Sequence, residues 1–168
     1  MNKLTVSVVA IFFSLAISAQ TVFFVPELND SLKLQMAKGL CYNNIIMGIN
    51  FAKSQGKTVE EYARYGGDQV KVVYDKEMGF EKFVNDHIYS FVAMAGNVVI
   101  LSQSENKIVF RISQVYPALE TQGPFWNVSY AEMMKWLEIV YIQISDYLGL
   151  SYAMKITDEG VEITIGKK

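Results

Sequence analysis

The sequence predicts an α+β domain in which about four helices pack on one face of a four-stranded antiparallel sheet. Four segments carry apolar residues at the three- and four-residue spacing of a helix. Two later segments alternate apolar and polar residues, as half-buried strands do. The predicted order is three helices, a hairpin, a fourth helix and a second hairpin, so the sheet is built from two hairpins.

The N-terminus predicts export. Residues 1–19 hold an early lysine, then a short apolar run, and end on the small residues Ser18 and Ala19. This is the layout of a secretory signal peptide, and the run is shorter than the about 20 residues that cross a bilayer. We expect cleavage after Ala19, with an uncleaved anchor as the alternative. Residues 20–168 then form one domain that is periplasmic or secreted.

Composition narrows the function classes. The chain is 51% hydrophobic with a formal net charge of −2, so it has no basic excess for a nucleic-acid partner. The single cysteine, Cys41, cannot form an internal disulfide, and with the single histidine, His87, it gives no metal site. No glycine-rich loop follows a predicted strand, so no nucleotide cofactor is expected.

The first predicted helix runs from Asn29 to Lys53, and Gly56 follows its end. Two apolar stripes predict that both sides of this helix are covered. The main stripe is Leu32, Met36, Leu40, Asn43, Met47 and Phe51, and the second is Leu34, Ala37, Cys41, Ile45 and Gly48.

The stretch TVEEYARYGGDQV opens the second helix. Thr58 and Glu61 fit a capping box, which starts the helix near Val59. Tyr62 and Tyr65 then share one face. The pair Gly66–Gly67 leaves two alternatives: a helix that breaks there, or one that continues because another element approaches closely.

A third helix over 78–94 places His87 on an apolar face with Phe80, Phe83, Val84 and Phe91. The next segment, 98–113, predicts a hairpin with a turn at Glu105–Asn106. This turn pairs Leu101 with Phe110 and Val99 with Ile112 on one face, together with Ile108. The other face keeps Ile100 and Val109, so we expect another chain to cover it in part, as in a homodimer.

An irregular loop over 114–127 carries the aromatic residues Tyr116, Phe125 and Trp126. Loops of this length are often lids or binding loops, and the alternative is that its aromatic side chains close the end of the core. A second capping box, Ser129 to Glu132, starts the fourth helix, which runs to Leu148. The segment 152–165 closes the chain as a hairpin that turns at 158–160.

Three segments carry a family resemblance: TVEEYARYGGDQV, WNVSYAEMMKWLE and DYLGLSYAMKITDEGVEITI. With them the chain resembles the L-2-amino-thiazoline-4-carboxylic acid hydrolase family, within the broader vinyl-4-reductase-type ligand-binding domains. The resemblance implies hydrolysis of a small cyclic C–N bond. It assigns no catalytic residue here, and the late paired cysteines that some vinyl-4-reductase-type relatives use for metal are absent.

Three functions follow as hypotheses. The first is an exported domain that binds a small apolar or aromatic molecule. Its predicted site is Tyr62, Tyr65, His87, Tyr116, Phe125 and Trp126, with the loop aromatics as a lid. The second is an envelope hydrolase, for which His87 is the candidate proton shuttle and a dyad with Cys41 a weaker one. The third is a dimeric accessory module.

Overall fold

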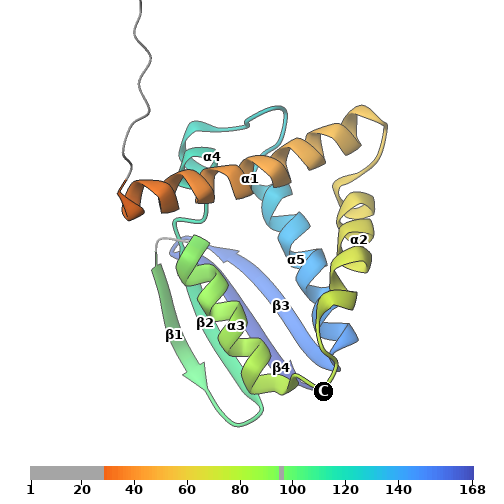
Figure 1. Cartoon of the computed structure of the whole chain (residues 1–168), viewed down its shortest axis with the longest axis vertical. Coiled ribbons are helices and arrows are strands. Elements are labelled where there is room, and N and C mark those ends of the chain that lie inside the picture. The colour runs from red at the N-terminus through yellow and green to blue at the C-terminus, as the bar shows by residue number, and fades with distance from the viewer. Residues whose placement is uncertain (1–28, 95–96) are drawn as a thin grey trace, which may run out of the picture.

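The computed structural model describes residues 29–94 and 97–168, which form the predicted α+β domain (Figure 1). The helical elements are α1 (Asp30–Ser54), α2 (Val59–Val70), the 3-10 helix η1 (Lys71–Val73), α3 (Gly79–Met94), α4 (Pro117–Gln122) and α5 (Tyr130–Tyr147). The strands are β1 (Asn97–Gln103), β2 (Lys107–Ser113), β3 (Leu150–Thr157) and β4 (Gly160–Lys167). The predicted signal peptide and its cleavage point lie outside the described residues. Within those residues, no helix is long and apolar enough to cross a membrane.

The four strands form one antiparallel sheet in the order β1-β2-β4-β3, so β2 and β4 join the two predicted hairpins. Alternate residues of these two central strands are buried in a single core with residues of α3 and α5. Those strand residues are Ile108, Phe110, Ile112, Val161, Ile163 and Ile165. The opposite face carries Arg111, which forms ion pairs with Glu159 and Glu162.

Both predicted capping boxes are present. The Glu61 amide donates to the Thr58 hydroxyl at 3.1 Å, and the Thr58 amide donates to the Glu61 carboxylate at 2.8 Å. Ser129 and Glu132 repeat the arrangement at the start of α5, at 3.2 and 2.8 Å. Each box satisfies amides that a helix start otherwise leaves without partners.

We expect Thr58→Ala to lower the free energy of unfolding by about 0.5–2 kcal/mol, because one amide of α2 loses its partner. Chemical denaturation measures the loss, and Thr58→Ser, which keeps the hydroxyl, is the matched control. A loss as large in the serine variant as in the alanine variant would contradict a capping role for Thr58.

The alternative of close packing at Gly66–Gly67 is the one that the structure shows. The helix α2 continues through both glycines to Val70. A Cβ added at Gly67 would meet the Gln143 side chain of α5, and one at Gly66 would lie 3.5 Å from the Trp136 ring. The two glycines therefore let α2 lie directly against α5.

The predicted burial of α1 is wrong. This helix buries Tyr42, Ile46, Ile49 and Ala52, whereas most of the large residues of the two predicted stripes are exposed. Cys41 is also exposed, although the sequence placed it on an apolar stripe. Apolar residues lie all around α1, so their spacing could not identify the face that meets the rest of the domain.

The predicted register of the first hairpin is correct only near its turn. Gln103 pairs with Ile108, as predicted, but an irregularity between Ile100 and Ser102 shifts the remaining pairs by one residue. Phe110 consequently pairs with Ile100 instead of Leu101. A one-residue shift moves side chains to the other face of a strand. The apolar residue Ile100 therefore lies beside Phe80 and Val84 of α3 and leaves the open face of the sheet.

The predicted irregular loop over 114–127 contains a short helix, α4, which begins at Pro117. Proline is favoured at the first position of a helix because its φ is already helical and its missing N–H needs no partner. Four non-glycine residues around this segment have positive φ angles: Gln114, Tyr116, Trp126 and Asn127. Contacts with the rest of the domain must hold these backbone conformations, which are uncommon for residues with a Cβ.

Candidate ligand-binding cavity

An apolar cavity of about 240 Å³ lies where α1, α2, α3 and α5 meet. Its lining residues come from these helices and from the segments after η1 and β2. They are Tyr42, Ile45, Val70, Tyr74, Ser90, Phe91, Met94, Val115, Trp136, Leu137, Val140, Tyr141 and Ile144. Many of these side chains are buried, among them Phe91, Val115 and Val140. We call this space the inner cavity.

The polar groups of the inner cavity are neutral. Burial raises the pKa of the hydroxyls of Tyr42, Tyr74 and Tyr141 above the ordinary tyrosine value, so all three stay protonated at physiological pH. The indole N–H of Trp136 is buried without a hydrogen-bond partner among the described residues. An unpaired buried donor costs about 1–3 kcal/mol, and an oxygen of a bound molecule could satisfy it. The walls thus suit an uncharged molecule with few polar atoms.

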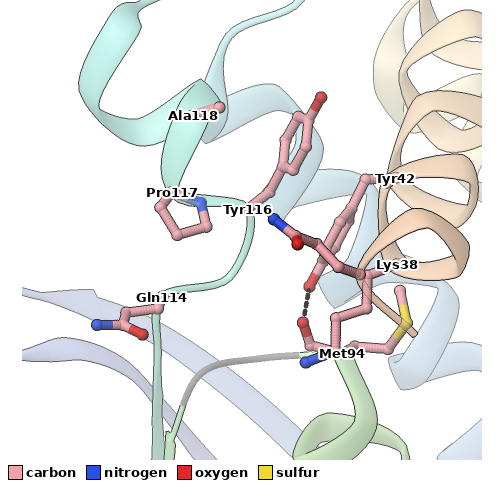
Figure 2. A pocket seen from close by; sticks show the side chains of 9 residues that line it. Lys38, Tyr42, Met94, Gln114, Tyr116, Pro117 and Ala118 are labelled. Atoms are coloured by element: carbon pink, nitrogen blue, oxygen red, sulfur yellow. Dashed lines mark hydrogen bonds between the residues drawn. The ribbon is translucent and has the colours of Figure 1, made fainter. Parts of the chain in front are cut away.

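A second hollow of about 390 Å³ adjoins the inner cavity (Figure 2). Its lining residues are Gln35, Lys38, Gly39, Tyr42, Met94, Gln114, Tyr116, Pro117 and Ala118. Tyr42 and Met94 line both spaces. The Tyr42 hydroxyl donates to the Met94 carbonyl oxygen at 2.9 Å, the bond drawn as a dashed line in Figure 2. The Tyr42 side chain therefore stands between this outer hollow and the inner cavity.

Tyr116 holds the Tyr42 side chain from the other side. Their ring centroids are 4.8 Å apart, and the Tyr116 hydroxyl donates to Asn43 Oδ1 at 2.9 Å. The segment before α4 is thereby fixed against α1. Of the three loop aromatics that the sequence assigned to a lid, Tyr116 is the one that lines the outer hollow.

His87 lies in the aromatic core beside the inner cavity and is 3% exposed. Its ring stacks on Phe83 at 5.6 Å and meets the Tyr141 ring edge-on at 4.2 Å. Its Nε2 is 3.2 Å from the Tyr152 hydroxyl. Burial lowers the pKa of His87 to about 3, so the ring is neutral at physiological pH. This environment suits a structural histidine, and the exposed Cys41 does not share it.

The remaining predicted site residues lie elsewhere. Tyr62 and Tyr65 line a third hollow of about 570 Å³ between α1 and α2. Phe125 and Trp126 stack on each other at 4.5 Å and are 40% and 46% exposed. The structure therefore does not bring the six predicted residues together around one space.

The inner cavity could not be predicted from the sequence, because segments far apart in the chain contribute to it. The one available signal was the excess of aromatic residues on α5, where Trp136 and Tyr141 widen the apolar stripe. Tyr42 could not be identified in this way, because it belongs to neither of the two predicted stripes of α1.

Among the described residues, no group of three His, Cys, Asp or Glu side chains could hold a metal ion. Comparisons with protein-family models, curated proteins and solved structures find no match to this chain. The resemblance to the thiazoline-carboxylate hydrolase family stays a prediction from the sequence.

Proposed function

We propose that this protein is an exported domain that binds a small, uncharged, apolar or aromatic molecule in the inner cavity. The observation that carries the proposal is a cavity of about 240 Å³ lined mostly by apolar side chains, several of which are buried. Apolar cavities of about 150 Å³ already bind benzene. The inner cavity therefore has room for a substituted aromatic ring. The proposed export of the protein rests on the predicted signal peptide.

The wall chemistry supports an uncharged ligand. A charged group would leave water for a space lined by Ile, Val, Leu and Phe with no opposite charge among the lining residues. The neutral hydroxyls of Tyr74 and Tyr141 and the indole of Trp136 supply the few directional groups that orient a molecule in an apolar site.

In this proposal, a ligand enters the inner cavity past the Tyr42 side chain. Displacing this side chain breaks its hydrogen bond to Met94, worth about 0.5–1.5 kcal/mol, and its ring contact with Tyr116. A molecule that reaches the outer hollow can then enter when the Tyr42 ring moves aside.

The test is calorimetric titration of the purified protein with toluene, together with a native mass spectrum that reports any molecule retained through purification. We expect Val140→Phe to weaken toluene binding at least about tenfold, or ~1.4 kcal/mol, because the larger side chain fills the inner cavity. Val72→Phe is the matched control, since Val72 is exposed on η1 and does not line the inner cavity.

Two outcomes count against the proposal. Equal toluene affinity in the Val140 variant and the parent protein would place the bound molecule elsewhere. A parent protein that binds no toluene and retains no molecule would remove the binding function itself. The hydrolase alternative gains no support from the inner cavity, whose lining residues include no Cys, His, Asp or Glu.

A further inference from the structure

Two hydroxyl groups in the wall of the inner cavity have no hydrogen-bond partner among the residues that the structure describes. They belong to Tyr74, which follows η1, and to Tyr141 on α5. The hydroxyls of Tyr42 and Tyr152, by contrast, have partners at 2.9 and 3.2 Å. A hydroxyl that leaves water without gaining a partner is costly, so we expect a polar atom of a bound molecule to pair with these two.

The Tyr141 hydroxyl can be reached from the inner cavity. Aromatic neighbours pack against its ring, with the centroid of His87 at 4.2 Å, that of Tyr152 at 5.7 Å and that of Phe91 at 6.0 Å. Its hydroxyl oxygen nevertheless keeps accessible surface, because it is not among the enclosed atoms that lack a partner. The inner cavity is the space that Tyr141 lines, so a molecule in this space can contact the hydroxyl.

Tyr74 and Tyr141 act on the same space. Both line the inner cavity, which has a volume of only about 240 Å³. Burial raises the pKa of Tyr141, and Tyr74 adds to this rise as a nearby ionisable group. Each hydroxyl therefore keeps a proton to donate at physiological pH. A carbonyl oxygen has two lone pairs, so one carbonyl group can accept a hydrogen bond from each tyrosine.

The other lining residues favour a carbonyl group over a carboxylate or a hydroxyl. No charged side chain lines the inner cavity, so a carboxylate would leave water without gaining a cation. The Ser90 hydroxyl already donates to the Asp86 carbonyl oxygen at 2.8 Å. A ligand hydroxyl would bring a further proton that needs an acceptor, whereas a carbonyl group brings only lone pairs.

We infer that the ligand of the inner cavity is a neutral aromatic carbonyl compound, an aryl ketone or ester, whose carbonyl oxygen accepts hydrogen bonds from Tyr74 and Tyr141. This inference rests on the proposed function, because it names the class of molecule that the same cavity binds. The two tyrosines are then the residues that distinguish a carbonyl group from an apolar group of the same shape, and the surrounding apolar walls hold the aromatic ring.

Calorimetric titration with two probes of the same shape tests the inference. Acetophenone carries the carbonyl oxygen, and α-methylstyrene has a methylene group in its place. We expect Tyr141→Phe to weaken acetophenone binding about three- to tenfold, because one hydrogen bond is lost, and Tyr74→Phe to do the same. Neither variant should weaken α-methylstyrene binding, since both keep the aromatic ring. Tyr89→Phe is the matched control, because Tyr89 is 72% exposed on α3 and does not line the inner cavity.

The infrared stretching band of the bound acetophenone carbonyl gives a second readout. Hydrogen bonds lower the frequency of this band, so in the parent protein it should lie below its position in an apolar solvent. The double variant Tyr74→Phe with Tyr141→Phe should move the band back toward that position. Circular dichroism verifies that each variant is folded.

Equal losses of the two probes in the tyrosine variants, or a carbonyl band that the substitutions leave unchanged, would overturn the inference. A parent protein that binds toluene and α-methylstyrene but not acetophenone would also overturn it, and the proposed function would then stand with another class of ligand. A parent protein that binds none of the three molecules would remove the proposed function together with this inference.

Discussion

Phe110→Ala is expected to lower the free energy of unfolding by about 3–5 kcal/mol. Phe110 is fully buried at the centre of β2, where it pairs with Ile100 on one side and Ile163 on the other. Its ring also faces the rings of His87 and Phe91, at 6.0 and 6.4 Å. Alanine leaves a cavity that these neighbours cannot fill without moving, because strands and α3 fix their positions. Urea denaturation at constant pH measures the loss.

Phe125→Ala is the matched control. Phe125 is 40% exposed and its ring stacks on that of Trp126, so its removal should cost less than about 1.5 kcal/mol. Similar losses in the two variants would contradict a larger contribution of Phe110 to the stability of the core.

Acid is expected to destabilise the protein through His87. Burial lowers its pKa in the folded state to about 3, whereas the unfolded chain has an ordinary histidine pKa near 6.5. Between these values the unfolded state binds more protons than the folded state, so stability falls as the pH falls. From pH 7 to pH 5 this effect amounts to about 2 kcal/mol. Urea denaturation at both pH values gives the difference.

His87→Phe separates this effect from the titration of carboxylates. The variant keeps an aromatic ring among Phe83, Phe91 and Tyr141 but cannot bind a proton, so its stability should change little between pH 7 and pH 5. The Thr58 amide and the nearby Lys57 lower the pKa of Glu61, which therefore keeps its charge in this range. An equally steep loss in the variant would show that another group causes the acid sensitivity.

The His87 cluster and the inner cavity are parts of one aromatic interior. Tyr141 lines the cavity and its ring lies 4.2 Å from that of His87, so protonation of His87 would disturb a cavity wall. Under the proposed function, the ligand affinity of the folded protein should therefore fall only near pH 3, whereas stability already declines below about pH 6.5.

The sequence by itself determined those features whose causes are local. Both capping boxes are short motifs that position a helix start through contacts three residues apart, and both are present at the predicted residues. The buried face of α3 could also be predicted, because the apolar residues around His87 lie on one side of the helix and polar residues on the other. The alternation of apolar and polar residues in β4 predicted which of its side chains are buried in the core.

Only the tertiary structure decided what depends on neighbours distant in the chain. The shift in strand register at Leu101 depends on how β1 packs beside α3. The side of α1 that is buried depends on where α5 and α3 lie. The inner cavity has no sequence motif, since Tyr42, Tyr74, Val115 and Tyr141 become neighbours only when separate elements pack. Packing contacts of this kind act across long sequence separations, and hydrophobic periodicity within one element cannot report them.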